Sequence, residues 1–568
     1  MKFDDVLTYL GDFGLYQKRT YLLVCLITIP CAWHQLLQVF LAAETDHWCS
    51  VSDFKGINCS TLSWDLTSAE CDERKKKFTI PPAADDDDTD YTHNCYRYSN
   101  ATVESFLSGD VSTSDWPLEA CESWDYDTSQ YKTTIIHEWD LVCNDKTKPA
   151  VSQSVYFGGV LFGSFFFGVL ADWIGRKPTL IISIVIQCTF GLAAAFSPSL
   201  TVFICLRFVV AAANYGVFLI AFIIGTELVG PSRRTFAGIA IEFFWAFGYM
   251  FLAAIAYFIR KWKTLALVIS LPGFLSIALY PVIPESVRWL LSQKKVEEAA
   301  EIINKAAKVN KVKLPDGIFD EKNFGKEPTS ESPKRATAID LFRTPKMRLK
   351  TINLLFNWFV NSMVYYGLSL STSNLGVDDY IAFLLSGAIE IPAYALSIFT
   401  IDYWGRRWNL CGTLVLGGVA CLLTILMPLG AWRITVAMIG KFGITASFGI
   451  VYIYSAEIYP TPVRSAGIGI SSVAARIGGI LSPFVLEFES LYEHLPLIIF
   501  GSLSIAAGLL VLFLPETNGR QLPETMADGE QFTRTNNGML SNMTMPSDVQ
   551  LEIKSGEENE AYKTEEKA

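Results

Sequence analysis

The chain has 568 residues, of which 51% are hydrophobic, 13% are aromatic and only 18% are charged. Soluble domains carry roughly 25% charged residues, so this composition, with a mean hydropathy of +0.30, excludes a purely soluble enzyme and indicates a membrane protein. The formal net charge of −11 is concentrated in residues 44–148, which contain 22 acidic and 9 basic residues, a balance of 9 − 22 = −13. The rest of the chain is slightly basic, which suits inner loops facing anionic lipid and disfavours nucleic acid as a partner.

Apolar stretches of about 20 residues, long enough to cross the membrane as helices, recur along the chain. We predict twelve spans, at 21–43, 149–170, 178–196, 200–225, 235–258, 263–283, 349–370, 379–401, 408–428, 432–455, 464–487 and 494–514. The first is expected to be a retained helix rather than a signal peptide, because residues 1–20 are polar and no A-x-A-like cleavage site follows a short apolar run. The predicted fold class is an all-α membrane protein with twelve transmembrane helices in two six-helix halves.

Basic residues of the short loops gather on one side of the predicted membrane. They are Lys18, Arg19, Arg176, Lys177, Arg233, Arg234, Lys346, Arg348, Lys350, Arg406, Arg407 and Arg464. The positive-inside rule makes this side cytoplasmic, so we expect both termini in the cytoplasm. We also expect the protein to be a multi-pass protein of the plasma membrane and a monomer. The loop with Arg260, Lys261 and Lys263 is an exception, since the same scheme places it outside.

The spans and the segments between them define the expected organisation. It comprises a cytoplasmic N-terminus (1–20), an N-terminal half (21–283) that includes an extracellular loop (44–148), a cytoplasmic linker (284–346), a C-terminal half (347–514) and an acidic cytoplasmic tail (515–568). The linker contains a helical stretch, VEEAAEIINKAAKVN.

The extracellular loop carries the signs of an oxidising compartment. Its six cysteines are Cys49, Cys59, Cys71, Cys95, Cys121 and Cys143, an even number that predicts three disulfides with fifteen connectivities still open. A metal site is the alternative, which the wide spacings and the lack of a C-x-x-C pair disfavour. Two glycosylation sequons, at Asn58 and Asn100, lie in the same loop and support its orientation.

Two distant segments repeat the same pattern, ADWIGRK at 171–177 and IDYWGRR at 401–407. The offset of 230 residues also relates acidic and basic residues elsewhere, giving the matched set Asp172, Arg176, Glu227 and Arg234 against Asp402, Arg406, Glu457 and Arg464. Repeated halves are typical of secondary transporters. We interpret the set as a cytoplasmic charge network that stabilises the outward-facing state and breaks on inward opening; simple positive-inside anchoring is the alternative.

The stretch from Gly168 to Lys177, G-x-x-x-D-x-x-G-R-K, resembles the loop signature of the major facilitator superfamily, although Ile398 replaces the glycine in the second copy. FGLYQ, HEWDLVC and PESVRWLLSQ resemble the organic cation, anion and zwitterion transporter family. AFGYM, EIPAY, GKFGITASF, YSAEIYPTPVR and SSVAARIGGILSPF are similar to its carnitine and ergothioneine branch. The resemblance implies small organic cations or zwitterions as substrates, such as carnitine-like betaines or ergothioneine, with Na⁺ as a coupling ion. Cys31 stands where that branch has an asparagine, so one cation ligand is missing.

Glu390 and Arg476 each fall about halfway along a predicted span, the eighth and the eleventh. Ionisable groups inside a membrane need a partner or a water-filled cavity. A zwitterion needs both signs, so we predict that both residues bind substrate; the resemblance adds that the Arg476 position is Arg in anion and carnitine transporters and Asp in typical cation transporters. The alternative is a mutual structural salt bridge.

Aromatic rings can hold a quaternary ammonium group through cation–π attraction. The aromatic candidates are Tyr215, Phe218, Trp358, Tyr365, Tyr452 and Tyr454, although most aromatic residues in so apolar a chain must pack or face lipid. The resemblance adds Gln187 and Ser472, because positions matching them and Tyr215 are linked to substrate handling in the carnitine branch.

The remaining charges inside spans are Glu242, Arg207 and Lys441. Arg207 and Lys441 are interpreted as structural or gating residues, and Glu242 as a candidate proton or cation site. No catalytic motif, metal ligand set or cofactor other than a coupling Na⁺ is expected, so the chain is not predicted to be an enzyme. The alternatives are a Na⁺-independent polyspecific organic cation transporter and, in another class, a non-transporting receptor or adhesion protein.

Overall fold

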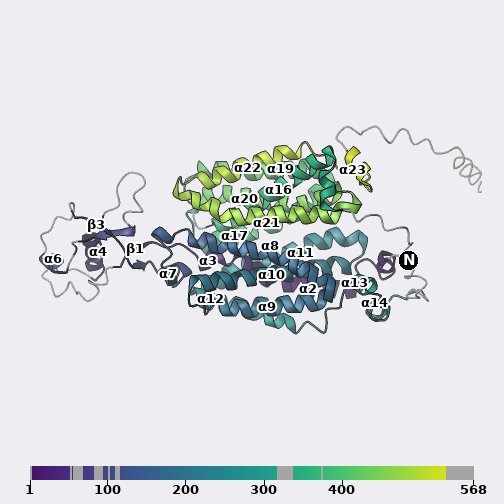
Figure 1. The fold of residues 1–568 in the computed structure, drawn as a ribbon, viewed down its shortest axis with the longest axis horizontal. Helices are drawn as coiled ribbons and strands as arrows, with labels where there is room; N and C mark the ends of the chain where they lie inside the picture. The colour runs from purple at the N-terminus through teal and green to yellow at the C-terminus, as the bar shows by residue number, and fades with distance from the viewer. Residues whose placement is uncertain are drawn as a thin grey trace, which may run out of the picture.

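The computed structural model describes residues 3–50, 54, 68–81, 94–99, 101, 103–108, 116–315, 337–372 and 375–532. Two bundles of long helices, one from each half of the chain, lie side by side (Figure 1). A small region around β1, α4 and α6 extends from one end, here called the loop end. The N-terminus, α13, α14 and α23 lie at the opposite end, here called the termini end.

Each half contributes six membrane-spanning units. The N-terminal half has α2 (Leu15–Leu36) with α3 (Gln38–Leu41), α8 (Lys148–Ile174), α9 (Arg176–Ala194), α10 (Leu200–Leu228), α11 (Arg234–Phe258) and α12 (Trp262–Ile277). The C-terminal half has α16 (Pro345–Leu370), α17 (Asp379–Ala388) with α18 (Glu390–Tyr403), α19 (Arg406–Ile425), α20 (Ala431–Ile458), α21 (Arg464–Glu487) and α22 (Leu495–Val511). Within the described residues, nine spans are both long and apolar enough to cross a membrane; α12 and α22 are apolar but shorter. With α16, these complete the predicted twelve-helix fold.

Local sequence explains where several of these helices begin or break. The Ser199 side chain caps α10 and the Asp378 side chain caps α17, each accepting a hydrogen bond from a backbone N–H of the first turn. The eighth span is interrupted between Ala388 and Glu390. Pro392 explains the break, because proline has no N–H to donate and its ring crowds the carbonyl four residues earlier. Glu390 is therefore the first residue of α18.

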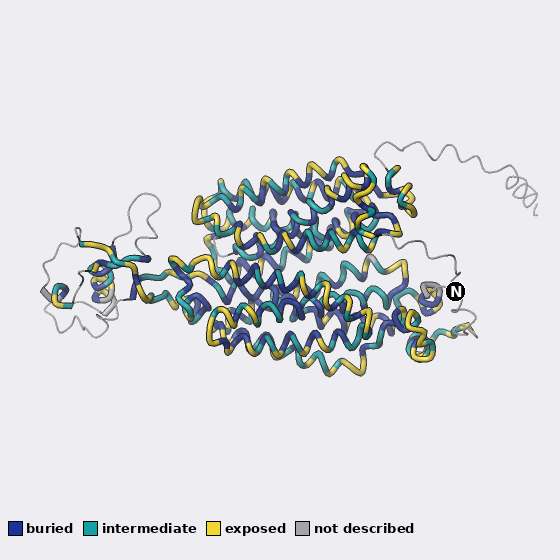
Figure 2. Tube along the Cα trace, in the orientation of Figure 1, coloured by how far each residue is buried: buried dark blue, intermediate teal, exposed yellow. Residues whose placement is uncertain are grey.

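Burial follows the expected pattern for a bundle that lies in lipid. Buried segments concentrate inside and between the two halves, whereas exposed segments follow the outer faces (Figure 2). Large apolar side chains such as Val169, Phe196, Phe399 and Phe513 are exposed, each by 70% or more. Such a surface is suited to hydrocarbon rather than to water.

The loop end is held together by disulfides and two short antiparallel ladders. Strand β1 (His47–Cys49) pairs with β4 (Trp124–Tyr126), and β2 (Tyr96–Tyr98) pairs with β3 (Leu118–Ala120). Helices α4 (Ser68–Thr79), α6 (Val103–Ser108) and α7 (Ile135–Trp139) accompany them. Cys49 is bonded to Cys121 and Cys95 to Cys143, and Cys71 is also disulfide-bonded. Cys59, Asn58 and Asn100 lie outside the described residues.

The predicted linker helix is confirmed as α14 (Val296–Asn310). Its apolar face, with Ile303 and Ala306, packs against Leu7 and Leu10 of the N-terminal segment that contains α1 (Phe3–Tyr9). Helices α13 (Val287–Ser292) and α23 (Met526–Gln531) lie at the same end. Short 3₁₀ turns complete the assignment: η3 (Cys143–Asp145), η4 (Pro231–Arg233), η5 (Ala338–Phe342), η7 (Thr461–Val463) and η8 (Phe488–Ser490).

Candidate functional site

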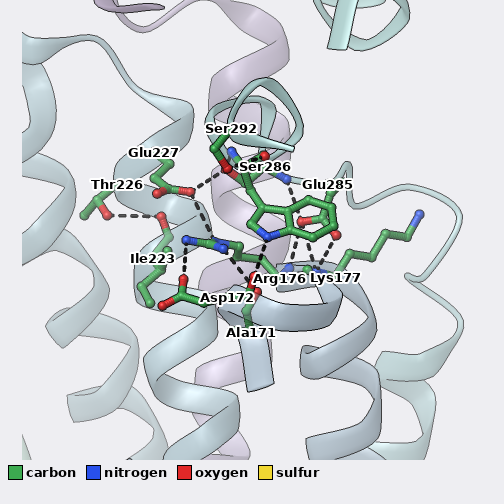
Figure 3. Close-up of polar contacts among 12 residues, drawn as sticks. Ala171, Asp172, Arg176, Lys177, Ile223, Thr226, Glu227, Glu285, Ser286 and Ser292 are labelled. Atoms are coloured by element: carbon green, nitrogen blue, oxygen red, sulfur yellow. Dashed lines mark hydrogen bonds and ion pairs between the residues drawn. The ribbon is translucent and has the colours of Figure 1, made fainter. Parts of the chain in front are cut away.

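The predicted charge network forms first around Arg176, at the start of α9 (Figure 3). Its guanidinium lies 2.9 Å from the Asp172 carboxylate and 3.8 Å from that of Glu227. Asp172 is 76% exposed, whereas Arg176 and Glu227 are 13% and 19% exposed. Exposed pairs contribute little, so Glu227 is the stronger partner by environment.

Glu285, in the motif PESVRWLLSQ, completes this cluster, although the sequence alone assigned it no role. Its carboxylate accepts hydrogen bonds from the backbone N–H groups of Arg176 (2.9 Å) and Lys177 (3.1 Å), and so neutralises the positive end of α9. Burial raises the pKa of Glu285, while these N–H groups favour its charged form. Gly175 adopts φ +106°, and a Cβ there would lie 2.5 Å from Glu285 Oε2, so a side chain at this turn is excluded.

The second half repeats this arrangement around Arg406. The Arg406 guanidinium lies 3.1 Å from Glu457 and 3.4 Å from Asp402. Glu516 accepts hydrogen bonds from the Arg406 and Arg407 backbone N–H groups, at 2.9 and 3.1 Å. Gly405 also has a positive φ, +79°, against Glu516.

A hydroxyl completes each copy. Ser286 donates to Glu227 and Thr517 donates to Glu457, both at 2.5 Å. We call Asp172, Arg176, Glu227 and Glu285 the N-half charge cluster, and Asp402, Arg406, Glu457 and Glu516 the C-half charge cluster. The contacts described above lie within one half in each case.

The two predicted arginines near these clusters begin the helices α11 and α21. Arg464 donates to the Tyr459 carbonyl at 3.2 Å, which joins the start of α21 to the end of α20. Arg234 is the first residue of α11. The two repeated arginines therefore occupy the same position in their halves, the first residue of a helix.

At the loop end, aromatic residues pack the two halves together. Phe40 stacks on Tyr380 with ring centroids 5.5 Å apart, and Tyr249 contacts Phe383 at 4.3 Å. The Tyr131 hydroxyl donates to Asp379 at 2.9 Å. These residues are buried in one cluster shared by both halves.

A central cavity lies between the halves, with about 620 Å³ of space not filled by atoms, adjoining solvent included. Its lining residues are Gln35, Val160, Asn214, Tyr215, Phe218, Glu242, Trp245, Tyr365, Tyr366, Tyr394, Phe448, Tyr452 and Arg476. Eight of the thirteen are aromatic and two are oppositely charged. Apolar walls with a few polar groups are typical of small-molecule sites.

Arg476 of α21 enters this cavity. Its guanidinium lies 4.5 Å from the centroid of the Tyr215 ring, so the two halves meet here through a cation–π contact. The side chain is 6% exposed, and its Nε is a buried donor without a hydrogen-bond partner within the described part of the chain. A buried unsatisfied donor is costly unless a ligand or water completes it.

Glu390 has a different environment. Its carboxylate lies 3.2 Å from Lys441 Nζ of α20 and accepts a hydrogen bond of 2.6 Å from the Tyr365 hydroxyl of α16. Lys441 also donates to Ser369. The structure therefore does not show the alternative of a Glu390–Arg476 salt bridge, because the ion-pair partner of Glu390 is Lys441.

The other predicted binding residues divide between the cavity wall and positions behind it. Tyr215, Phe218, Tyr365 and Tyr452 line the cavity, as expected. Trp358 contacts the Tyr452 ring from behind, with centroids 4.2 Å apart, and donates to Ser455.

Three further predicted residues, like Trp358, do not line the cavity. Gln187 donates at 2.9 Å to Asn214, which does line the cavity. Tyr454 donates to the Pro515 carbonyl at 2.6 Å, next to the C-half charge cluster. Ser472, on α21, precedes Arg476 by one turn and is outside the lining.

The sequence analysis did not assign seven of the lining residues to the site: Gln35, Val160, Asn214, Trp245, Tyr366, Tyr394 and Phe448. Tyr366 and Asn214 are next to the assigned residues Tyr365 and Tyr215 in the sequence, and this adjacency is the sequence signal that could have indicated them. Trp245 donates to the Tyr365 hydroxyl at 3.2 Å and thereby extends the hydrogen-bonded chain that ends at Glu390.

Comparisons with known proteins agree with this architecture. Residues 99–528 match the model of the family described as "Sugar (and other) transporter". The "Organic cation transporter protein" of Drosophila melanogaster is 44% identical over 543 residues, 94% of this chain and 95% of that one. Human "Organic cation/carnitine transporter 2" is 37% identical over 566 residues, 98% of both chains.

Solved structures show the same fold at low identity. The xylose transporter XylE from E. coli, in a partially occluded inward open conformation, matches with a TM-score of 0.53 and 19% identity, over 67% of this chain and 90% of that chain. The human organic anion transporter MFSD10 matches with a TM-score of 0.51 and 12% identity, over 87% and 99%.

Proposed function

Since the chain belongs to the organic cation, anion and zwitterion transporter family of the major facilitator superfamily, we propose that it carries small organic cations and zwitterions across the plasma membrane. Carnitine-like betaines and ergothioneine are the first candidates. Family membership favours transport over the receptor or adhesion alternative. The proposed orientation places the termini end in the cytoplasm and the loop end outside.

The observation that carries this proposal is Arg476 in an aromatic cavity between the halves. A guanidinium holds a carboxylate through two parallel hydrogen bonds, and the Nε of Arg476 has no partner of its own among the described residues. Around it, Tyr366 and Tyr452 line the cavity and can contribute aromatic rings to the binding of a quaternary ammonium group. The cavity therefore offers complementary groups to both ends of a betaine.

Alternating access would proceed by breaking one set of contacts between the halves and forming another. The aromatic packing at the loop end, including Phe40 against Tyr380, favours a conformation closed on that side. The charge clusters at the other end are each bonded within one half in this conformation, so these bonds do not break when that end opens. In the proposed cycle, contacts between the two halves form there when that end closes. Opening and closing of the two ends is the proposed cycle.

The environment of Cys31 bears on sodium coupling. The Cys31 thiol, at the position of the missing asparagine, donates to the carbonyls of Ile27 (3.9 Å) and Asn214 (3.7 Å). A thiol that acts as a donor is a poor ligand for Na⁺, which prefers oxygen. This observation favours the Na⁺-independent organic cation transporter as the second candidate.

Uptake by cells expressing the chain tests the proposal directly. Labelled carnitine, ergothioneine, tetraethylammonium and a dicarboxylate would be compared with Na⁺ present and with Na⁺ replaced by N-methylglucamine. We expect uptake of a zwitterion or a cation above that of mock cells, and none of the dicarboxylate. Uptake of the dicarboxylate alone would contradict the proposal, and unchanged zwitterion uptake without Na⁺ would select the second candidate.

A further inference from the structure

Glu242 is an acidic residue in the central cavity that the established contacts do not explain. It lies on α11 of the N-terminal half, eight positions after Arg234, or roughly 12 Å along the helix at 1.5 Å per residue. Its side chain is partly exposed and lines the cavity together with Tyr215, Tyr366 and Tyr452. Glu242 is thus a membrane-embedded carboxyl group that faces the space available to a ligand.

The two acidic residues of this region differ in their partners. Glu390 is completely buried and has both a lysine and a tyrosine hydroxyl against its carboxylate. Within the described part of the chain, Glu242 makes neither a hydrogen bond nor an ion pair with another side chain. An ionisable residue at membrane depth needs a partner or a water-filled cavity, and for Glu242 only the cavity offers one.

Glu242 and Arg476 lie on opposite halves of the molecule. Glu242 belongs to α11 and Arg476 to α21, yet both line the same cavity. Tyr366 and Tyr452 line the same cavity. The cavity therefore has an acidic residue from the N-terminal half, a basic residue from the C-terminal half, and aromatic rings in its lining.

We propose that Glu242 holds the cationic end of a substrate while Arg476 holds its carboxylate, so that a bound zwitterion bridges the two halves. This inference rests on the proposed function and deepens it, because it assigns the cation-binding acid of the site to Glu242. A zwitterion contacts both halves only when they are close, so it stabilises that conformation over the others. A simple cation contacts Glu242 but not Arg476, and therefore stabilises the conformation with close halves less.

Three competitors of similar shape, which differ in the charges that they carry, test the two contacts separately. They are γ-butyrobetaine, which has both charges; butyltrimethylammonium, which has only the cation; and 5,5-dimethylhexanoate, in which carbon replaces the ammonium nitrogen and only the carboxylate remains. Their inhibition constants are measured against whichever labelled substrate the wild-type chain takes up, at equal surface amount. Ligand-induced thermal stabilisation of the purified protein gives a second measurement that does not require transport.

In Glu242→Gln we expect γ-butyrobetaine and butyltrimethylammonium to bind about tenfold to hundredfold more weakly, the range for a lost charged contact. Binding of 5,5-dimethylhexanoate should stay unchanged or become tighter, because a repelling carboxylate is removed. Glu242→Asp retains the charge and should keep the preference for cations. Glu301→Gln is the matched control, since it removes an exposed glutamate of α14 outside the cavity.

The outcomes separate this inference from the proposed function. Equal losses for all three competitors, or no loss for either cationic one, would overturn the role of Glu242 while wild-type transport stands. Failure of the wild-type chain to bind any of the three would instead count against the proposed substrate class. If Glu242→Gln reaches the membrane poorly, the thermal-stabilisation pattern of Glu242→Asp against wild type decides, because a loss of the cation preference there would also refute the assignment.

Discussion

Replacing Lys441 by methionine should destabilise the C-terminal half more than any single substitution of a surface charge. Lys441 is 1% exposed, lies 3.2 Å from the fully buried Glu390 and joins α20 to α18. Methionine has a similar length but no charge, so Lys441→Met leaves the Glu390 carboxylate buried with only the Tyr365 hydroxyl against it. Glu390→Gln removes the opposite charge, and the double variant removes both.

The distance gives the scale of the effect. At 3.2 Å and an effective dielectric constant of about 20, two unit charges attract by roughly 5 kcal/mol. Desolvation opposes this gain in the intact pair, but the single variant keeps the buried carboxylate without its counter-charge. We therefore expect Lys441→Met to lose about 3 to 5 kcal/mol of unfolding free energy, and the double variant to lose less than the sum of the two single variants.

Unfolding of the purified protein in mixed micelles with increasing SDS would measure these differences, with surface expression as a second readout. Lys263→Met is the matched control, because Lys263 pairs with Glu138 at 2.6 Å while the two side chains are 46% and 34% exposed. An exposed pair is worth at most about 1 kcal/mol. If Lys441→Met proved no more destabilising than Lys263→Met, or if the two single losses simply added, the reasoning would be refuted.

Three further predictions concern the site, the charge clusters and the loop. Arg476→Ala should weaken binding of carboxylate-bearing zwitterions about tenfold to hundredfold and spare permanent cations; equal losses in surface-normalised uptake would contradict a carboxylate-binding role. Glu227→Gln should reduce turnover more than Asp172→Asn, because Glu227 is 19% exposed and Asp172 is 76% exposed; initial-rate measurements at saturating substrate would show the order, and a reversed order would count against it. Replacing Asn58 and Asn100 together should abolish the glycan mass shift on gels, and a shift that persists would argue against the proposed orientation.

Much of the fold could be predicted from the sequence, because the features that decide it are local or periodic. Hydrophobic length alone predicts the spans, although the predicted helix 379–401 divides into α17 and α18 at Ile389 and the predicted helix 21–43 divides into α2 and α3 at Leu37. The repeat of Asp172 and Arg176 at Asp402 and Arg406 predicts the two halves from the sequence alone. The helix α14 follows from its amphipathic pattern in the same way.

The site could be predicted only in part, since depth along a helix says nothing about which way a side chain points. The sequence places Glu390 and Arg476 at a similar depth in the membrane. In the structure, however, the packing of α16, α18 and α20 pairs Glu390 with Lys441, whereas Arg476 lines the cavity. Tyr452 lines the cavity while Tyr454, two residues later on the same helix, turns to the Pro515 carbonyl. The sequence determined which charges must be satisfied inside the membrane. The tertiary structure decided which of them pair with each other and which are left for a ligand, because that depends on helix rotation, which is set by contacts between different helices.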